Sequence, residues 1–275
     1  MFMKKIFKYF FAVLCCASVM TVKAANEISI AGLTITDEIA ASGIVDALNQ
    51  VDGVTATGTI TYNSATKTMT LNNASVIASN AKRLLAFSTW AGEVSIVLEG
   101  SNTLKNTNSG YVEGLFCNTY QKHITISGAG NLTISVLNWY PAFLMGGRLI
   151  IDNTTVSIIC ENYHQYGIGY NSGAGGELVC NKANLTATNV SSLSNITLTD
   201  CYLVQPTGAE LVNEDGTWYV DKKGSEAPVV ISTESKPTQM ENIVVETNAV
   251  KRIVNGQLVI ERDGRVFNAS GAEVK

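Results

Sequence analysis

Short segments in which apolar and polar residues alternate recur along residues 69–203. Each segment starts with alternating apolar positions, passes through a polar step rich in Asn, Gly, Asp or Ser, and ends in a second apolar pair. A period of two is typical of half-buried β-strands, and Asn and Gly tolerate the left-handed backbone of tight corners. The segments are MTLNNASV (69–76), IVLEGSNTL (96–104), ITISGAGNL (124–132), LIIDNTTV (149–156), LVCNKANL (178–185) and ITLTDCYL (196–203).

A second, weaker set of apolar segments lies between the members of the first. It comprises LLAF (84–87), GLFC (114–117), AFL (142–144) and GIG (167–169). Each repeat therefore holds about three short strands and no helix. Such a unit cannot bury its apolar face alone, but successive units can bury it by stacking. We predict an all-β fold, a right-handed parallel β-helix over residues 60–232 with about 25–28 residues per coil.

Stacked coils bring equivalent positions of the repeat into line. Aligning the six segments predicts an inward ladder of Leu71, Leu98, Ile126, Ile151, Cys180 and Leu198. An antiparallel β-sandwich also has short strands bounded by turn signals, and it is the alternative. Strands of a sandwich need not resemble one another, whereas these segments do, so the pattern favours the solenoid.

The repeats are flanked by segments that read as caps. Residues 25–59 form an N-terminal strand and cap region, in which ISIAGLTI (28–35) predicts a strand pair. A short helix from Glu38 to Leu48 is expected to cover the open end of the first coil, because an exposed sheet edge invites aggregation. At the other end, Trp218–Val220 and Val229–Ile231 are predicted strands.

The chain then changes character. Residues 233–242 are polar, contain Pro237 and are typical of a linker. Residues 243–275 form a separate small β segment, in which Arg262-Asp263-Gly264 signals a hairpin. A unit of this size is marginal alone, so it is expected to dock on a partner or to be recognised by one.

The N-terminus has the layout of a secretory signal peptide, residues 1–24. Lys4, Lys5 and Lys8 precede an apolar run at residues 9–22, and small residues at 22 and 24 suit a signal peptidase. A buried strand or a membrane anchor is the alternative, but the run is short for a bilayer. We expect a protein that is secreted or held on the outer cell surface, with no membrane span after cleavage.

Charge and motif content exclude several function classes. Four of the 19 Lys and Arg lie in the signal segment, whereas all 23 Asp and Glu remain, so the mature chain is acidic and lacks a basic cluster. Nucleic acid and anionic lipid are therefore poor partner candidates. His123 and His164 fall in different coils, no Gly-x-Ser-x-Gly turn exists, and Gly128-Ala129-Gly130 does not open a helix.

Two carboxylates are candidates for an enzyme pair. Glu99 and Asp152 occupy equivalent positions in the alignment, about two strand spacings or ~10 Å apart. That separation suits an inverting glycosidase, but it also suits two solvated corner residues, which is the favoured interpretation. We expect no catalytic residues, no metal and no cofactor, with a weak or degenerate polysaccharide lyase or hydrolase as the third alternative.

The mature chain keeps four cysteines, Cys117, Cys160, Cys180 and Cys201. An even number in an exported protein permits disulfides. Three of them lie in apolar strands, where Cys behaves as a small buried hydrophobe, so free buried thiols are favoured. No C-x-x-C spacing suggests zinc.

Aromatic residues supply the best functional lead. They recur at matching loop positions of successive repeats, so stacking is expected to align them on one flank, where exposed rings suit the apolar faces of sugars. The alternative is that the rings pack onto the loops and fill gaps beneath them. The candidate ligand-binding residues are Tyr111, Trp139, Tyr140, Tyr163 and Tyr166, with Trp90 and Tyr120 marking a second loop position.

The repeat series GTITYNSATKTMTLNNASV, VSIVLEGSNTL, HITISGAGNLTI, LIIDNTTVSI and NITLTDCYLVQPTGA resembles a family of secreted β-helical repeat proteins of Bacteroidetes described as carbohydrate-binding domain-containing. The likeness covers about residues 28–232 and includes relatives of a polysaccharide-lyase-like cellulose-binding protein. It implies a non-catalytic binding protein for polysaccharide or glycan. A structural or adhesin-like surface protein with a protein partner is the second alternative.

The tail IVNGQLVIERDGRVFNASGAEVK is similar to the sorting segments of type IX secretion in Bacteroidetes. This likeness implies the secretion or anchoring machinery as a partner. A small β cap is the alternative interpretation of the tail.

Overall fold

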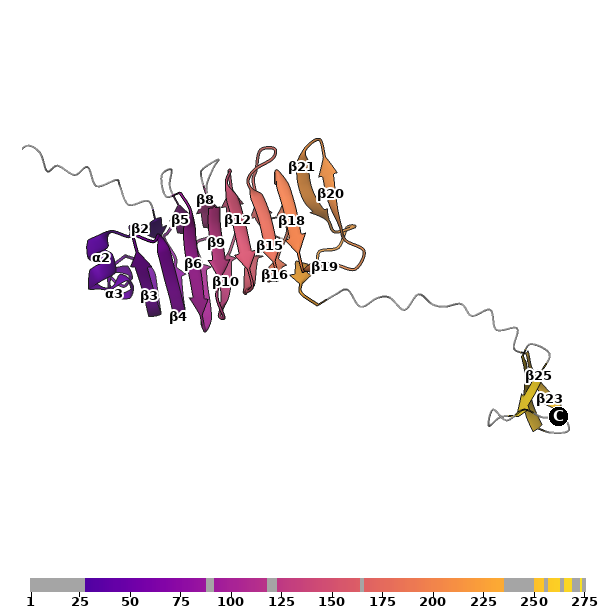
Figure 1. Ribbon diagram of the computed structural model, residues 1–275. Coiled ribbons are helices and arrows are strands. Elements are labelled where there is room, and N and C mark those ends of the chain that lie inside the picture. The colour runs from indigo at the N-terminus through magenta and orange to yellow at the C-terminus, as the bar shows by residue number, and fades with distance from the viewer. Residues whose placement is uncertain are drawn as a thin grey trace, which may run out of the picture. The chain divides into compact units, whose positions relative to one another are not determined.

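The computed structural model describes residues 28–87, 92–117, 123–163 and 166–234, and parts of the C-terminal segment at 250–254, 257–262, 265–268 and 273. The chain divides into two compact units, residues 1–235 and 236–275. The first unit is a β-solenoid, in which strands of successive coils lie side by side (Figure 1). The predicted signal peptide, residues 1–24, lies outside the described residues.

Three stacks of parallel strands build the solenoid, as the two sets of apolar segments predict. In each coil, the chain visits the first, second and third stack in turn. The first stack is β4 (Thr68–Ala78), β6 (Val94–Glu99), β9 (His123–Ser127), β12 (Arg148–Asp152), β15 (Glu177–Asn181) and β18 (Asn195–Thr199). The second is the end of β4 with β7 (Ser101–Asn106), β10 (Asn131–Val136), β13 (Thr155–Cys160) and β16 (Asn184–Ala187). The third is β5 (Arg83–Phe87), β8 (Glu113–Cys117), β11 (Tyr140–Leu144), β14 (Ile168–Gly169) and β17 (Val190–Ser191).

The predicted inward ladder is present with one correction in register. Ile126 pairs with Ile96 and not with Leu98, which pairs with Leu71 on the other side. From Ile126 onward the ladder runs through Ile151, Cys180 and Leu198 as predicted. The error is two residues, which keeps the same side chains on the core face.

The glycine turn after β9 explains the shift. The Gly130 amide donates to the Leu98 carbonyl at 2.9 Å, so the turn and not Ile126 lies beside Leu98. A Cβ on Gly128 would be 2.4 Å from the Leu98 carbonyl oxygen, and its φ is +116°. Only glycine suits this position, because both the contact and the backbone angle exclude a side chain.

The corner between the first and second stacks repeats one backbone conformation. Its residues have φ between +45° and +116°, the region that Gly and Asn tolerate best. This conformation explains why polar steps interrupt every apolar segment of the first set. The corner residues are Asn73, Gly100, Gly128, Asn153, Lys182 and Asp200.

The buried side chain of Asn102 forms hydrogen bonds at this corner with the backbone of three coils. Its side-chain oxygen accepts from the Ala74 amide at 2.8 Å, and its Nδ2 donates to the Glu99 and Asn131 carbonyls at 3.1 Å. The side chain is buried, so a smaller residue would leave these groups without partners.

The N-terminal end is capped by both helix and strand. β1 (Ile28–Ile30) pairs with β2 (Leu33–Thr34) and with β5, and β3 (Val54–Asn63) pairs antiparallel with β4. The helix predicted from Glu38 to Leu48 is instead two short helices, α2 (Asp37–Ser42) and α3 (Ile44–Leu48). Gly43 divides them because its φ of +117° cannot continue a helix. Within the described part of the chain, no helix is long and apolar enough to cross a membrane.

The opposite end contains the strands predicted at 218–220 and 229–231. β22 (Val229–Ser232) lies antiparallel between β16 and β19 (Tyr202–Gln205), and β21 (Thr217–Asp221) pairs with β20 (Glu210–Glu214). The Leu193 and Trp218 amides and carbonyls bond reciprocally at 2.7 and 3.0 Å, which ties this hairpin to the last coil.

The C-terminal unit is a small antiparallel sheet. The predicted hairpin is β24 (Gln257–Arg262) with β25 (Arg265–Asn268), and β23 (Val250–Val254) pairs with the other edge of β24.

The four cysteines of the solenoid are buried thiols that form no disulfide with one another, as favoured from the sequence. Burial raises the pKa of the Cys160, Cys180 and Cys201 thiols above the ordinary value. A raised pKa lowers the thiolate fraction, and the thiolate is the reactive form. In a chain that begins at residue 25, we expect a disulfide reagent at about pH 8 to leave all four thiols unmodified until denaturant is added. Rapid modification of the native protein would contradict the packing.

Candidate functional site

The loops that lead from the second stack into the third carry the predicted aromatic residues. Tyr111 lies just before β8, Trp139 and Tyr140 lie at the start of β11, and Tyr163 and Tyr166 lie before β14. Because β8, β11 and β14 are neighbours in one stack, the loops that precede them belong to three adjacent coils.

The five rings form one connected cluster, which we call the aromatic flank. Ring centroids are 5.1 Å apart for Tyr111 and Trp139, and 5.3 Å apart for Trp139 and Tyr166. Tyr166 also contacts Tyr140 at 4.8 Å and Tyr163 at 5.9 Å. Trp90 and Tyr120, the second predicted loop position, lie outside the described residues.

Exposure divides the flank into a packed centre and two open ends. Trp139, Tyr140 and Tyr166 are partly buried, and Trp139 stacks on Tyr166 with an angle of 30° between the rings. Tyr111 and Tyr163, at the two ends, are 46% and 47% exposed. The central rings therefore cover one another, whereas the end rings retain surface that a ligand can contact.

An asparagine ladder holds the three loops in register below the rings. Asn138 donates to the Ser109 carbonyl at 2.6 Å and accepts from Asn162 at 2.8 Å. Trp139 follows in a left-handed conformation, with φ of +73°. This conformation is costly for a bulky residue and persists only where its surroundings determine it.

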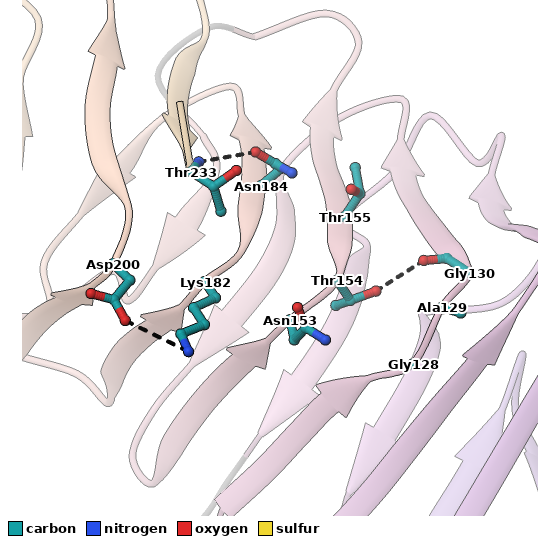
Figure 2. Close-up of a pocket in the computed structure, with 10 residues that line it drawn as sticks. All are labelled: Gly128, Ala129, Gly130, Asn153, Thr154, Thr155, Lys182, Asn184, Asp200 and Thr233. Carbon is teal, nitrogen blue, oxygen red and sulfur yellow. Dashed lines mark hydrogen bonds and ion pairs between the residues drawn. The ribbon is translucent and has the colours of Figure 1, made fainter. Parts of the chain in front are cut away.

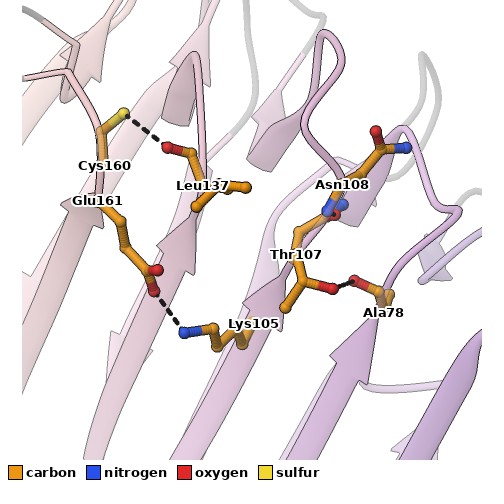
Figure 3. A network of polar contacts seen from close by, with 8 residues as sticks. Ala78, Lys105, Thr107, Asn108, Leu137, Cys160 and Glu161 are labelled. Atoms are coloured by element: carbon orange, nitrogen blue, oxygen red, sulfur yellow. Dashed lines mark hydrogen bonds and ion pairs between the residues drawn. The ribbon is translucent and has the colours of Figure 1, made fainter.

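Polar contacts close to the same loops add further support (Figure 3). Lys105 Nζ pairs with the Glu161 carboxylate at 2.6 Å, and Cys160 Sγ donates to the Leu137 carbonyl at 3.9 Å. Lys105 and Glu161 are both partly exposed, so their pair orders the surface more than it stabilises the fold.

A buried carboxylate, which the sequence did not single out, fixes one end of the flank. The Glu113 side chain is 5% exposed, and its Oε2 lies 2.6 Å from Arg83 Nε. Its Oε1 accepts from the Tyr111 hydroxyl at 3.0 Å. Burial and then the negative charge of Glu113 raise the pKa of Tyr111, which therefore stays protonated and keeps donating at neutral pH. Burial also raises the pKa of Tyr140.

Further rings extend the flank onto the outer face of the third stack. Phe116 and Phe143 lie in register on neighbouring strands with centroids 6.0 Å apart, and both are 5% exposed. Tyr140 and Tyr170 form T-shaped ring pairs with Phe143, and the Arg83 guanidinium lies 3.5 Å from the Phe116 centroid.

A signal for this outer cluster exists in the sequence. The segments 84–87 and 114–117 are continuously apolar and do not alternate, which is typical of strands buried on both faces.

Glu99 and Asp152, the carboxylates considered as an enzyme pair, do not occupy equivalent positions of the repeat. Ser127 pairs with Val97 on one side and with Asp152 on the other. The two-residue shift that corrects the ladder also separates this pair along the strand. Glu99 instead accepts a hydrogen bond from Asn72 at 2.7 Å. Within the described residues, no three His, Cys, Asp or Glu side chains gather as a metal site would need.

Comparison with known proteins gives no neighbour from which a function could be carried over. No protein family model, no curated protein and no solved structure matches this chain. A solenoid fold hosts many unrelated functions, so a function has to be argued from the chemistry of a site. The aromatic flank is the feature of the described surface on which such an argument is best based.

Proposed function

We propose that this protein is a secreted or cell-surface binding protein for polysaccharide or glycan, that it is not catalytic, and that the aromatic flank is its contact surface. The observation that carries the proposal is the connected series of five rings across three coils, with Tyr111 and Tyr163 half exposed at its ends. Export through residues 1–24, and sorting or anchoring through residues 243–275, belong to the same proposal.

The chemistry of the rings suits this ligand class. A pyranose ring presents an apolar C–H surface that packs on an aromatic face, and hydroxyls around its rim that need polar partners. At the flank, the exposed tyrosines offer both, because each ring carries a hydroxyl. The Tyr111 hydroxyl is oriented by Glu113, so its acceptor lone pairs face away from that carboxylate.

The rigidity of the flank supports binding without large ordering costs. Tyrosine and tryptophan have few rotatable bonds, and here their loops are held by the Asn138 ladder. Rings that are already in place lose little conformational entropy when a ligand docks, so more of the contact energy appears as affinity.

The test removes the two exposed rings together. We expect Tyr111→Ala with Tyr163→Ala to weaken binding of a glycan selected on an array by about tenfold or more, because each lost ring contact contributes ~1 kcal/mol. The measurement is titration calorimetry with the purified full chain and the selected oligosaccharide.

The matched control is Tyr202→Ala. Tyr202 is 50% exposed and lies on β19, outside the flank, so it removes a similar ring with a similar exposure. We expect unchanged affinity in this variant and unchanged melting temperatures in both proteins. Binding that survives the double variant, or that falls equally in the control, would remove the flank from consideration.

A further inference from the structure

A polar groove of about 500 Å³ runs along the corner between the first and second stacks. It crosses four successive corners, from the turn after β9 to the turn after β18 (Figure 2). This is a different corner from the one that bears the aromatic flank. The lining residues are Gly128, Ala129, Gly130, Asn153, Thr154, Thr155, Lys182, Asn184, Asp200 and Thr233.

The sequence of the corners explains why a groove forms here. The turn after β9 is Gly128-Ala129-Gly130, which has almost no side chain to fill the corner. A Cβ on Gly130 would be 2.5 Å from the Gly100 carbonyl oxygen, so this turn packs down on the preceding coil. Thr154 Oγ1 donates to the Gly130 carbonyl at 2.9 Å and holds the next turn beside it.

The far wall comes from the antiparallel cap. β22 ends at Ser232, and Asn184 Oδ1 accepts from the Ser232 hydroxyl at 3.0 Å and from the Thr233 amide at 3.2 Å. These bonds use only the oxygen of the Asn184 amide, so its Nδ2 is left to donate within the groove.

Several polar groups along the groove have no partner among the described contacts. The Asn153 and Thr155 side chains are exposed, and no hydrogen bond of theirs is present within the described residues. Lys182 Nζ lies 3.9 Å from Asp200 Oδ2, and both side chains are 66% exposed. Their ion pair is therefore weak, and both charged groups remain able to bind a ligand. The groove therefore presents both donors and acceptors, with almost no net charge.

We infer that this groove is a second glycan site, which binds a neutral, extended oligosaccharide along the solenoid axis. Four corners at the spacing of stacked strands span about 14 Å, which suits a short linear run of sugar units better than a compact ligand. The groove offers amide, hydroxyl, ammonium and carboxylate groups that can form hydrogen bonds with a ligand. They suit a sugar, because every sugar hydroxyl can both donate and accept a hydrogen bond. The opposite charges of Lys182 and Asp200 favour a neutral chain over an acidic one.

The groove and the aromatic flank would bind the same class of ligand, but they have no residue in common. The two sites can therefore be separated by mutation.

The groove variant is Asn153→Gly, Thr155→Ala and Lys182→Gly in one chain. Glycine is chosen at 153 and 182 because φ there is +47° and +45°. The matched control is Asn73→Gly, which changes the same corner position of an earlier coil, outside the groove, at a φ of +47°.

The experiment is hydrogen exchange on the full chain with three neutral probes, cellohexaose, xylohexaose and mannohexaose, and one acidic probe, a galacturonic acid hexamer. It is run on the native protein, the groove variant, the control and the Tyr111→Ala, Tyr163→Ala variant. We expect at least one neutral probe to slow exchange in peptides covering 128–131 and 153–155 in the native protein, the control and the flank variant. In the groove variant, we expect affinity at these peptides to fall about tenfold or more.

The other possible results decide separately about the groove site and about the aromatic flank. Protection confined to peptides around the flank overturns the groove site and leaves the proposed function standing. The groove site is also overturned if only the acidic hexamer protects the groove, or if protection by the neutral probes is lost in the Asn73→Gly control. Groove protection together with no protection around the flank in the native protein, with every probe, supports the groove and counts against the flank. Absence of protection at both places with every probe overturns both.

Discussion

Replacing Ile126 by alanine is expected to lower the free energy of unfolding by about 2–5 kcal/mol. Ile126 is fully buried and lies between Ile96 and Ile151 in the inward ladder. Its neighbours are held by the backbone pairing of the coils, so they cannot move to fill the space. The loss therefore includes both the transferred methyl groups and the cavity that they leave. Equilibrium denaturation in urea measures the change.

The adjacent position supplies the control. Thr125 lies on the same strand, but its side chain points to the outer face and is only partly buried. We expect Thr125→Ala to cost less than about 1 kcal/mol, because no cavity forms on an open face. Equal losses at the two positions would contradict the assignment of faces and with it the stacking of the coils.

Replacing Gly114 by alanine is expected to cost about 3 kcal/mol, although only one methyl group is added. A Cβ at this position would be 2.3 Å from the Pro141 carbonyl oxygen and 2.7 Å from Ile134 Cγ2. Pro141 is in β11, the neighbouring strand of the third stack, so the added group forces two coils apart. Gly114 is also next to Glu113, so we expect the flank to lose order together with stability. Thermal unfolding and near-ultraviolet circular dichroism report the two effects.

Gly110→Ala is the matched control for this effect. A Cβ on Gly110 would meet only the Asn108 side-chain oxygen, at 3.2 Å, and a flexible side chain can move away. We expect a change within about 0.5 kcal/mol of the native value. If Gly114→Ala is as well tolerated as Gly110→Ala, the close contact of β8 with β11 is wrong.

The part of the fold that could be predicted from the sequence is the part that repeats. Alternation of apolar residues in the first set of segments marked the core face, and the weaker set marked the third stack. Their mutual resemblance separated a solenoid from a sandwich, because only stacking requires successive units to be alike. The same periodicity predicted that Tyr111, Trp139 and Tyr166 lie on adjacent loops, where their rings are in contact.

The register between β6 and β9 could not be predicted in this way. A shift of two residues leaves every apolar side chain on the same face, so the pattern is equally satisfied by Leu98 or Ile96 opposite Ile126. The choice depends on how tightly the Gly128 turn packs against Leu98, which is a backbone contact between coils. The position of Glu99 relative to Asp152 followed the same contact and was wrong for the same reason.

The burial of individual aromatic rings and charged side chains could not be predicted from the sequence either. Nothing in the residue order distinguishes exposed Tyr163 from half-buried Tyr166 or links Glu113 to Tyr111. Those contacts depend on the distances between loops of different coils.

Local periodicity of the residues is sufficient to assign an all-β repeat chain, its core positions and the rows along which its aromatic residues gather. The pairing of the coils, the packed centre of the flank, the buried carboxylate and the polar groove depend instead on how the coils pack on one another. These features arise between segments about one repeat apart, where backbone contacts of a few ångströms select one arrangement among several that the same pattern allows.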